Sequence, residues 1–554
     1  MAIQCNMFKK IFSTLISIHI ICIHIYAQQK QNNYSPKPKL IIGIVVDQMR
    51  WDFLYRYADR YKNDGGFKRL LTQGFSCNNT MIPYTPTITA CGHTCIYTGS
   101  VPAIHGITGN NWWDNQSQKN MYCTEDKTVQ SVGSKNSNGE MSPRNMLATT
   151  ITDELRLATN FKSKVIGIAL KDRGAILPAG HSANAAYWYD SKTGDFITST
   201  YYMQALPNWV NQFNQKKLVN QYYTQGWKTQ YPIETYTQST TDEKTYESKP
   251  FGNNQTKFPY NFSDFVAKDY SKILITPYGN TLTFNMAEAA IEGEQLGTTN
   301  NITDFLAISF SSTDYVGHNF GPNAVETEDT YLRFDTELGY FMNYLDKKYG
   351  KNNYVLFLTA DHGVAHVPGF MQEHALPAGT MDDNVLTKEL NEKLKEQFKI
   401  DSLIKGIYNY QVILNHASID AAHIDHEKII QYVIQQITTK PYIARAFDLN
   451  KLSTTTLPEK LRNSFANGYY PSRSGDIQFI LKPGYIDGGK TGTTHGLWNP
   501  YDAHIPLLWY GWNIKSGSSS EEVYMTDIAP TLAALLHIQM PSGCIGKPIK
   551  VMFE

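Results

Sequence analysis

Apolar residues of this chain are concentrated in short, unbroken runs, and most of these runs end beside charged residues. Four runs occupy residues 40–46, 164–170, 305–310 and 353–359, and a fifth, at 505–509, follows a His-Gly pair. A continuous apolar run of this length is typical of a strand that is buried on both faces, as in a parallel sheet. Stretches with helical features separate the runs, notably 51–61, 325–349 and 525–536. We therefore predict an α/β fold with a doubly wound, mostly parallel central sheet flanked by helices.

Two stretches depart from this alternation. Residues from 178 to about 300 are rich in Tyr, Asn, Gln, Thr and Gly and show few clear periods, which fits either surface loops or a cap over a site. Residues from about 382 to 450 read as helix, strand, helix, strand, which predicts a small inserted α/β module. The remainder, within 28–554, is long enough to form one large domain that carries both insertions.

The first 27 residues have the features of a signal peptide. Lys9 and Lys10 precede an apolar run at 11–26, and Ala27 offers a small residue for cleavage. A membrane anchor is the alternative, but the run is short for a span and contains Ser and His. We expect a periplasmic or secreted monomer without a membrane anchor. Basic and acidic residues number 50 each in the full chain, and no basic stripe favours nucleic-acid binding.

Export places the cysteines in an oxidising environment, where disulfides form. Five cysteines follow the predicted signal peptide, and four of them surround residues 86–94: Cys77, Cys91, Cys95, Cys123 and Cys544. An odd number leaves at most two disulfides and one free thiol within one chain, and the pairing cannot be read from the sequence. We expect disulfides that brace the 86–94 stretch.

The strand ends and one late His-Gly turn carry a set of carboxylates and imidazoles. This set comprises Asp47, Asp314, His318, Asp361, His362 and His495. Any one of them is more often a cap or an ion-pair partner, but strand ends of a parallel sheet meet at one edge. Carboxylate and imidazole ligands suit catalytic zinc, and six ligands are about right for two ions with open positions. We predict two Zn²⁺ per chain.

Residues near this edge suggest a nucleophile and an anionic substrate. Thr89 precedes a helical stretch, where most threonines serve as N-caps, but a metal would allow its hydroxyl to act as a nucleophile. Lys171 and Arg173 alternate along what we read as an extended segment, so both could face a phosphate; an ordinary basic turn is the alternative. Asn110, or equally the neighbouring Asn111, could donate to a phosphoryl oxygen.

Taken in order, these motifs resemble the alkaline phosphatase superfamily. They are Val45-Val46-Asp47, Pro86-Thr87-Ile88-Thr89, Ser312 to His318, Thr359-Ala360-Asp361-His362-Gly363 and Thr494-His495-Gly496. Within the superfamily, the chain is similar to the Thr-nucleophile branch of type I phosphodiesterases and nucleotide pyrophosphatases, and more closely to the phosphate-irrepressible, PafA-type alkaline phosphatases. Ala360 departs from the Ser or Thr that the phosphodiesterase branch often has there, but it is no ligand. The sulfatase motif Cys/Ser-x-Pro-x-Arg does not match at any of the cysteines.

The resemblance implies roles for single residues. Asp314, His318 and His495 would hold one zinc, and Asp47, Asp361, His362 and the Thr89 oxygen would hold the other. Thr89 would form a phosphothreonine intermediate, Asn110 would bind a phosphoryl oxygen, and Lys171 and Arg173 would favour monoesters and replace a third metal. The sequence thus predicts an alkaline phosphatase that acts on a broad range of phosphate monoesters. The alternatives are a phosphodiesterase or nucleotide pyrophosphatase, and a metal-braced binding protein.

Overall fold

The computed structural model describes residues 37–553, so the predicted signal peptide lies outside the described residues. A single compact unit runs from Lys39 to Glu554 and holds the whole of the fold discussed below. None of the helices among the described residues is both long enough and apolar enough to cross a membrane.

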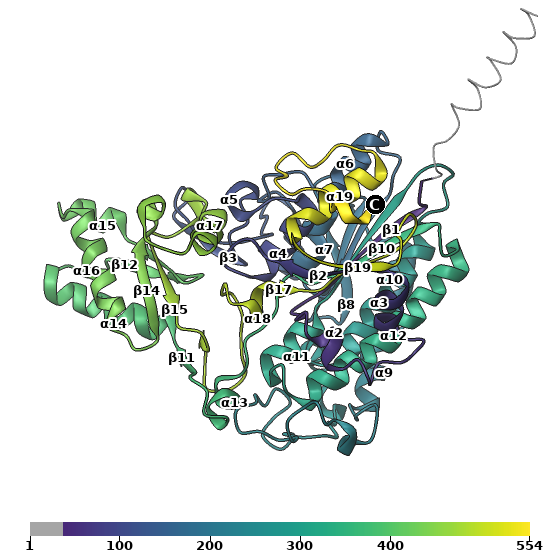
Figure 1. Cartoon of the computed structure of the whole chain (residues 1–554), viewed down its shortest axis with the longest axis horizontal. Coiled ribbons are helices and arrows are strands. Elements are labelled where there is room, and N and C mark those ends of the chain that lie inside the picture. Colours follow the sequence, from purple (N-terminus) through teal and green to yellow (C-terminus); the bar gives the residue numbers. More distant parts are fainter. Residues whose placement is uncertain (1–36, 554) are drawn as a thin grey trace, which may run out of the picture. The chain divides into compact units, whose positions relative to one another are not determined.

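The central sheet has eleven strands, and its middle is parallel (Figure 1). The five parallel strands lie side by side in the order β10 (Tyr354–Thr359), β1 (Leu40–Val46), β9 (Asp304–Phe310), β6 (Val165–Ala169) and β7 (Ala185–Asp190). Ile44 of β1 pairs with Ile308 on one side and Leu358 on the other. All seven residues of β1 are buried, because helices cover both faces of the sheet. The apolar runs of the sequence therefore form the centre of the sheet.

The edges of the sheet are mainly antiparallel. On one side lie β18 (Leu507–Gly511), β2 (Phe75–Met81), β17 (His504–Ile505) and β19 (Gly517–Tyr524); on the other lie β8 (Asp195–Ser199) and β5 (Ser131–Val132). Only β19 among these pairs parallel to its neighbour, which is β2. Reversed strands need no crossover helix, so a short turn joins β7 to β8, whereas β2 pairs with β17 and β18 from the other end of the chain. The doubly wound, mostly parallel sheet that the sequence predicts is confirmed.

Two groups of helices cover this sheet. The first includes α4 (Thr89–Thr98), α6 (Ile151–Ala158), α7 (Asp172–Ala179) and α19 (Ile528–Leu536), and the second includes α3 (Gly66–Gln73), α10 (Tyr278–Gly293), α11 (Ser312–Phe320) and α12 (Val325–Tyr349). The long helix at 325–349 has the predicted bounds. The helix expected at 51–61 is only one turn long, α2 (Phe53–Arg56). The chain after it is held in turns, since the Tyr61 hydroxyl donates to the Phe53 carbonyl and Asp335 accepts from two backbone N–H groups.

The segment 178–300 differs from the expected loops or cap. It supplies β7 and β8 to the central sheet, and then α8 (Asn208–Gln215), α9 (Leu218–Gln225) and α10, which packs beside β9 and β6. Tyr187 and Trp188 are buried among these elements. The polar composition hid this part of the core because its buried aliphatic and Phe residues are scattered among polar ones, and because several other buried residues are Tyr or Trp, whose rings pack inside although they carry polar atoms.

The module predicted at 382–450 extends further than expected. Its four-stranded antiparallel sheet has the order β12 (Ile404–Tyr408), β13 (Gln411–Leu414), β15 (Ile477–Leu481) and β14 (Ile443–Asp448). The predicted single strand at 407–414 is the hairpin β12–β13, and β15 comes from beyond residue 450. Helices α14 (Asp383–Phe398) and α16 (His426–Thr438) pack on this sheet and form a separate apolar core with it (Figure 1).

The expected disulfides are absent from the described residues. All five cysteines, Cys77, Cys91, Cys95, Cys123 and Cys544, are free thiols. Four of them are buried, and burial raises the pKa of Cys123 to about 12. The Cys91 thiol donates to the carbonyl of Ile107 instead. The 86–94 stretch is braced by helix packing rather than by covalent bonds, which corrects the prediction.

Candidate active site

The ends of neighbouring parallel strands bring the predicted ligands to one edge of the sheet. Asp47 directly follows β1, Asp361 follows β10, and Asp314 lies in the first turn of α11 after β9. Lys171 follows β6 and is the N-cap residue of α7. Because these four strands are adjacent, residues more than 300 positions apart in the chain come into contact. The sheet order thus determines the composition of the site.

The first group of ligands is Asp314, His318 and His495, whose ligand atoms lie within 4.8 Å of one another. His318 Nε2 is 3.1 Å and His495 Nε2 is 3.6 Å from Asp314 Oδ1. Asp314 and His318 are one helical turn apart on α11, so both side chains reach the same point. His495 comes from the loop that follows β16 (Tyr485–Asp487).

The second group is Asp47, Asp361 and His362, all fully buried. His362 Nε2 is 3.5 Å from Asp47 Oδ1 and 3.4 Å from Asp361 Oδ2. A glycine after Asp361 and His362 could allow a sharp turn there by adopting a positive φ. The φ of Gly363 is not in the left-handed region; instead a Cβ there would lie 2.1 Å from the Tyr501 carbonyl oxygen, so close packing requires the glycine.

Each ligand histidine is oriented by a backbone carbonyl. The Nδ1 of His318 is 2.8 Å from the Thr493 oxygen, and the Nδ1 of His495 is 2.7 Å from the Thr87 oxygen. The Nδ1 of His362 lies 2.9 Å from the Gly363 oxygen. A proton on Nδ1 therefore bonds to a carbonyl and leaves the Nε2 lone pair free, which is the usual arrangement of metal-bound histidines.

The donor atoms fit metal ions. Asp47 Oδ1 and Asp361 Oδ2 are buried without any hydrogen-bond partner, an arrangement that is costly unless a cation binds there. Burial, together with the charges of Asp314 and Asp361, raises the pKa of Asp47 well above its usual range. Burial and the neighbouring His362 and His318 lower the pKa of His495, which keeps its imidazole neutral as a ligand. Both groups therefore have the donor composition of metal sites, and the second group also has the unmet bonding of one.

Lys171 lies between the two groups. Its ammonium is 2.7 Å from Asp47 Oδ2 and 2.6 Å from Asp314 Oδ2, so each aspartate binds Lys171 through one oxygen and faces its histidines with the other. Burial alone would lower the pKa of Lys171, but the two carboxylates outweigh it and raise the pKa. The lysine is therefore a permanent cation at the centre of the site.

Thr89 is the first residue of α4 and is not its N-cap. Ile88 occupies the cap position and makes no side-chain cap bond, so the Thr89 hydroxyl is not used to begin the helix. Thr89 Oγ1 is instead 3.3 Å from His362 Nε2, at the second ligand group. A Cβ on Gly92 would lie 2.4 Å from the Asp361 carbonyl oxygen, so this glycine lets the helix approach the ligands closely.

Asn110 and Arg173 lie beside these groups. Asn110 Oδ1 accepts from the Ala90 backbone N–H at 3.0 Å, which leaves the amide NH₂ free to face the cavity. The segment of Lys171 and Arg173 is not extended as we expected, because α7 begins at Asp172. Arg173 is held by the Tyr122 hydroxyl at 3.0 Å, while its Nε has no partner.

Known proteins resemble this chain over nearly its whole length. The type I phosphodiesterase / nucleotide pyrophosphatase family matches residues 41–502. The chain belongs to this family. It is 53% identical over 549 residues to alkaline phosphatase PhoV of Synechococcus elongatus, and this match covers 98% of this chain and 99% of the relative. It is also 51% identical over 526 residues to alkaline phosphatase PafA of Elizabethkingia meningoseptica, and this match covers 94% of this chain and 95% of the relative. A crystal structure of wild-type PafA superposes with a TM-score of 0.92 at 50% identity, covering 94% of this chain and all of the other.

This member of the family contains supporting residues that our sequence reasoning missed. Gln48 donates its side-chain N–H to Asp314 Oδ1 at 2.8 Å and its backbone N–H to Asp361 Oδ1 at 3.2 Å, so it connects the two groups. The Thr313 hydroxyl donates to the Asp47 carbonyl at 2.6 Å. The only signal for Gln48 was its position directly after Asp47.

The other histidines near the motifs lie outside the two groups of metal-type ligands. His93 contacts the Thr89 carbonyl at 2.9 Å and the Ser309 hydroxyl at 2.7 Å, and its Nδ1 lies 3.4 Å from Asp361 Oδ2. His105 is wholly buried, with its Nδ1 accepting from the Ile107 N–H. His366 contacts Arg50 and Asn323, and His504 contacts the Asn78 carbonyl. His93 alone among them touches the candidate nucleophile.

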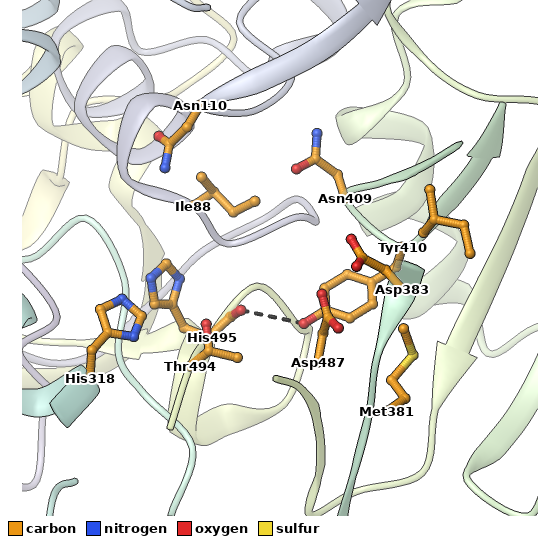
Figure 2. A pocket seen from close by; sticks show the side chains of 11 residues that line it. Ile88, Asn110, His318, Met381, Asp383, Asn409, Tyr410, Asp487, Thr494 and His495 are labelled. Carbon is orange, nitrogen blue, oxygen red and sulfur yellow. Dashed lines mark hydrogen bonds between the residues drawn. The ribbon is translucent and has the colours of Figure 1, made fainter. Parts of the chain in front are cut away.

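A cavity of about 310 Å³ opens beside the first ligand group (Figure 2). Its lining joins Asn110, His318 and His495 to residues of the inserted module, among them Asn409 and Tyr410. No residue of 178–300 lines it. The wall opposite the ligands therefore comes from the module, and not from the segment that we considered as a cap.

Proposed function

We propose that this protein is a zinc-dependent alkaline phosphatase that hydrolyses a broad range of phosphate monoesters through a phosphothreonine intermediate. The observation that carries the proposal is the placement of the Thr89 hydroxyl, free of any capping bond, against the buried one of two groups of metal-type ligands. The high identity to proteins named alkaline phosphatase over nearly the whole chain supports it.

Two zinc ions are proposed as the cofactors. Asp314, His318 and His495 would hold one ion, and Asp47, Asp361, His362 and the Thr89 oxygen would hold the other. Zinc at these positions would lower the pKa of a bound hydroxyl and neutralise negative charge that develops on the reacting oxygens. Carboxylate and imidazole donors without thiolate support zinc in a catalytic role.

The side chains divide the reaction between them. Thr89 Oγ forms a bond to phosphorus as the ester P–O bond breaks and the alcohol leaves. Water then forms a bond to phosphorus as the Thr89 P–O bond breaks, which releases phosphate and restores the hydroxyl. Two successive in-line displacements give net retention at phosphorus.

The chain's own donors stabilise the phosphoryl oxygens. The NH₂ of Asn110 is free because its Oδ1 is already bound to Ala90 N–H, which favours Asn110 over Asn111 as the donor. Lys171 and Arg173 supply two positive charges beside the site. A monoester carries one more negative charge than a diester, so these cations favour monoesters. They would also replace a third metal ion.

The proposed enzyme is a periplasmic or secreted monomer. The N-terminal pattern of Lys9, Lys10 and the following apolar run supports export. Free thiols in the fold are no obstacle, because the four buried ones are shielded from oxidants.

Comparison of kcat/KM for an aryl phosphate monoester and the matching aryl diester tests the proposal. We expect the monoester to be preferred, and we expect Lys171→Ala with Arg173→Ala to reduce monoester turnover far more than diester turnover. Because the matched family is named for diesterases, a diester preference in the wild type would refute the assignment to monoesters. Equal losses on both substrates would reject the role of the two cations.

Replacement of Thr89 tests the nucleophile. Thr89→Ala should lower kcat by about 10³-fold or more and abolish covalent phosphate labelling, whereas Thr89→Ser should retain part of both. Thr98→Ala is the matched control, since this hydroxyl lies on the same helix and donates only to the Thr94 carbonyl. Labelled phosphate on a residue other than Thr89, detected by mass spectrometry after acid quench, would exclude the proposed intermediate.

A further inference from the structure

The cavity beside the metal-type ligands is larger than a phosphate needs, and its far end is built differently from its near end. At the near end lie Asn110, His318 and His495 (Figure 2). At the far end lie Asp383, Asp487, Asn409 and Tyr410 with apolar Ile407 and Met381. A phosphate at the near end would direct its ester group into the far end. The chemistry of this wall therefore bears on which alcohols the site accepts.

Hydrogen bonds within the fold use up the donors of this wall. The Asn409 NH₂ donates to the carbonyls of Thr108 at 3.4 Å and Asn111 at 3.1 Å, and Figure 2 shows its oxygen turned toward the cavity. The Tyr410 hydroxyl donates to the His495 carbonyl at 3.4 Å. What these two side chains still offer a ligand is acceptor oxygens.

Two carboxylates complete the wall. β11 (Gly379–Met381) pairs in parallel with β16, which places Met381 beside Asp487, and Asp383 follows two residues later at the start of α14. The two side chains are close enough to interact: burial, and then the charge of Asp383, raises the pKa of Asp487 to about 7. A cation between or beside them would relieve this repulsion.

Positive side chains are missing from the lining of this cavity. Its titratable members are the two aspartates, the two ligand histidines and Tyr410, whose pKa is raised by burial so that its phenol stays neutral. Lys405 lines an adjoining hollow that Asp383 and Asp487 also line. Its ammonium is turned to other partners there: it donates to Gln118 at 2.6 Å and lies 4.4 Å from the centre of the Trp113 ring. The far end thus combines negative charge with acceptors, and the lysine of the adjoining hollow is bound to Gln118.

We propose that the far end of the cavity is a subsite for the leaving group, and that Asp383 and Asp487 select phosphate monoesters whose alcohol carries an ammonium group. This inference rests on the proposed monoesterase function. Ile407 and Met381 contact the short carbon chain of such an alcohol, while Asn409 and Tyr410 accept hydrogen bonds from its donors. An alcohol with its own carboxylate or second phosphate is disfavoured by like charge.

Three substrates of the same length test the proposal: 2-aminoethyl phosphate, 2-hydroxyethyl phosphate and carboxymethyl phosphate. They differ in the terminal group alone, which is positive, neutral or negative. We expect kcat/KM to fall in that order for the wild-type protein. An interaction with a charged partner of this kind changes kcat/KM by about 10-fold between neighbouring members of the series.

The double variant Asp383→Asn with Asp487→Asn should bring the three values together, whereas Asp401→Asn should keep their spread and leave hydrolysis of p-nitrophenyl phosphate within about twofold of the wild type. Asp401→Asn is the control, because this exposed aspartate of the same module is paired to Lys395 outside the cavity. A flat series in the wild type, or an unchanged series in the double variant, would overturn the subsite. A preference for carboxymethyl phosphate that grows with added Mg²⁺ would assign the aspartates to a metal ion and also overturn it. Failure to hydrolyse p-nitrophenyl phosphate would instead refute the underlying monoesterase function.

Discussion

Replacement of His105 by Asn should make the protein's stability less sensitive to acid. His105 is the last residue of α5 (Pro102–His105) and is wholly buried. Burial, with a small contribution from the charge of Arg473, lowers its pKa to about 3. Its Nδ1 accepts the Ile107 N–H at 3.1 Å, and the Asn side-chain oxygen can accept from the same position in an Asx-turn. The substitution therefore keeps the acceptor and removes the titrating ring.

The sign and size of the effect follow from the two pKa values. An unfolded histidine takes up a proton near pH 6.5, while the folded His105 does so only near pH 3. Its contribution to stability is therefore fully present above about pH 6.5 and is lost progressively as the pH falls toward 3. At about pH 5 the loss from this residue is about 2 kcal/mol, since one unit of pKa corresponds to about 1.4 kcal/mol.

Urea unfolding at pH 7 and pH 5 measures this loss. Every other titrating group, including the metal-type ligands, changes alike in both proteins, so the difference between the two pH-dependent losses isolates His105. The wild type should lose about 2 kcal/mol more than His105→Asn between these pH values. His423→Asn is the control, because His423 is exposed and has φ +54°, which Asn tolerates. Equal losses in wild type and His105→Asn would refute the assignment of a buried neutral imidazole.

Three further predictions concern the ligand edge. Gly92→Ala places a methyl carbon 2.4 Å from the Asp361 carbonyl oxygen, so turnover should fall at least about tenfold and the free energy of unfolding should fall by about 1–3 kcal/mol. Gly489→Ala is the control, because its methyl group meets open space and should change neither quantity. Normal turnover in Gly92→Ala would contradict the close approach of α4. Lys171→Met leaves Asp47 and Asp314 without their shared cation, so the free energy of unfolding of the metal-free protein should fall by about 3–5 kcal/mol. The zinc-loaded variant should lose less, so the unfolding curves of the variant with and without zinc should differ. Chelation should lower the melting temperature because Asp47 Oδ1 and Asp361 Oδ2 then stay unpaired, and Zn²⁺ should restore it; a melting temperature indifferent to both treatments would argue against metal at these groups.

Local pattern was enough to predict the central part of the fold. The run at 40–46 has no polar position, so it can only be stable where both faces are covered, and it lies at the centre of the sheet as predicted. The helix at 325–349 has its predicted bounds for the same reason, since its periodicity is local. The polar residue after each apolar run was visible too, and Asp47 and Asp361 lie at one sheet edge because parallel strands end together.

Other features depended on contacts between distant parts of the chain. The module extends beyond residue 450 because β15 pairs with β13 and β14, and no local sequence pattern predicts this pairing. The five cysteines are free thiols, four of them buried, and composition alone carries no geometry from which pairing could be read.

The sequence by itself determined which residue types are available at the strand ends, and therefore the kind of chemistry that is possible there. Only the tertiary structure decided which of these residues contact one another. Lys171 binds one oxygen of Asp47 and one of Asp314, and Gln48 donates hydrogen bonds to both Asp314 and Asp361. Hydrogen bonds act over about 3 Å, and their partners here are separated by more than 100 residues, so strand order and helix packing must be complete before these bonds can form.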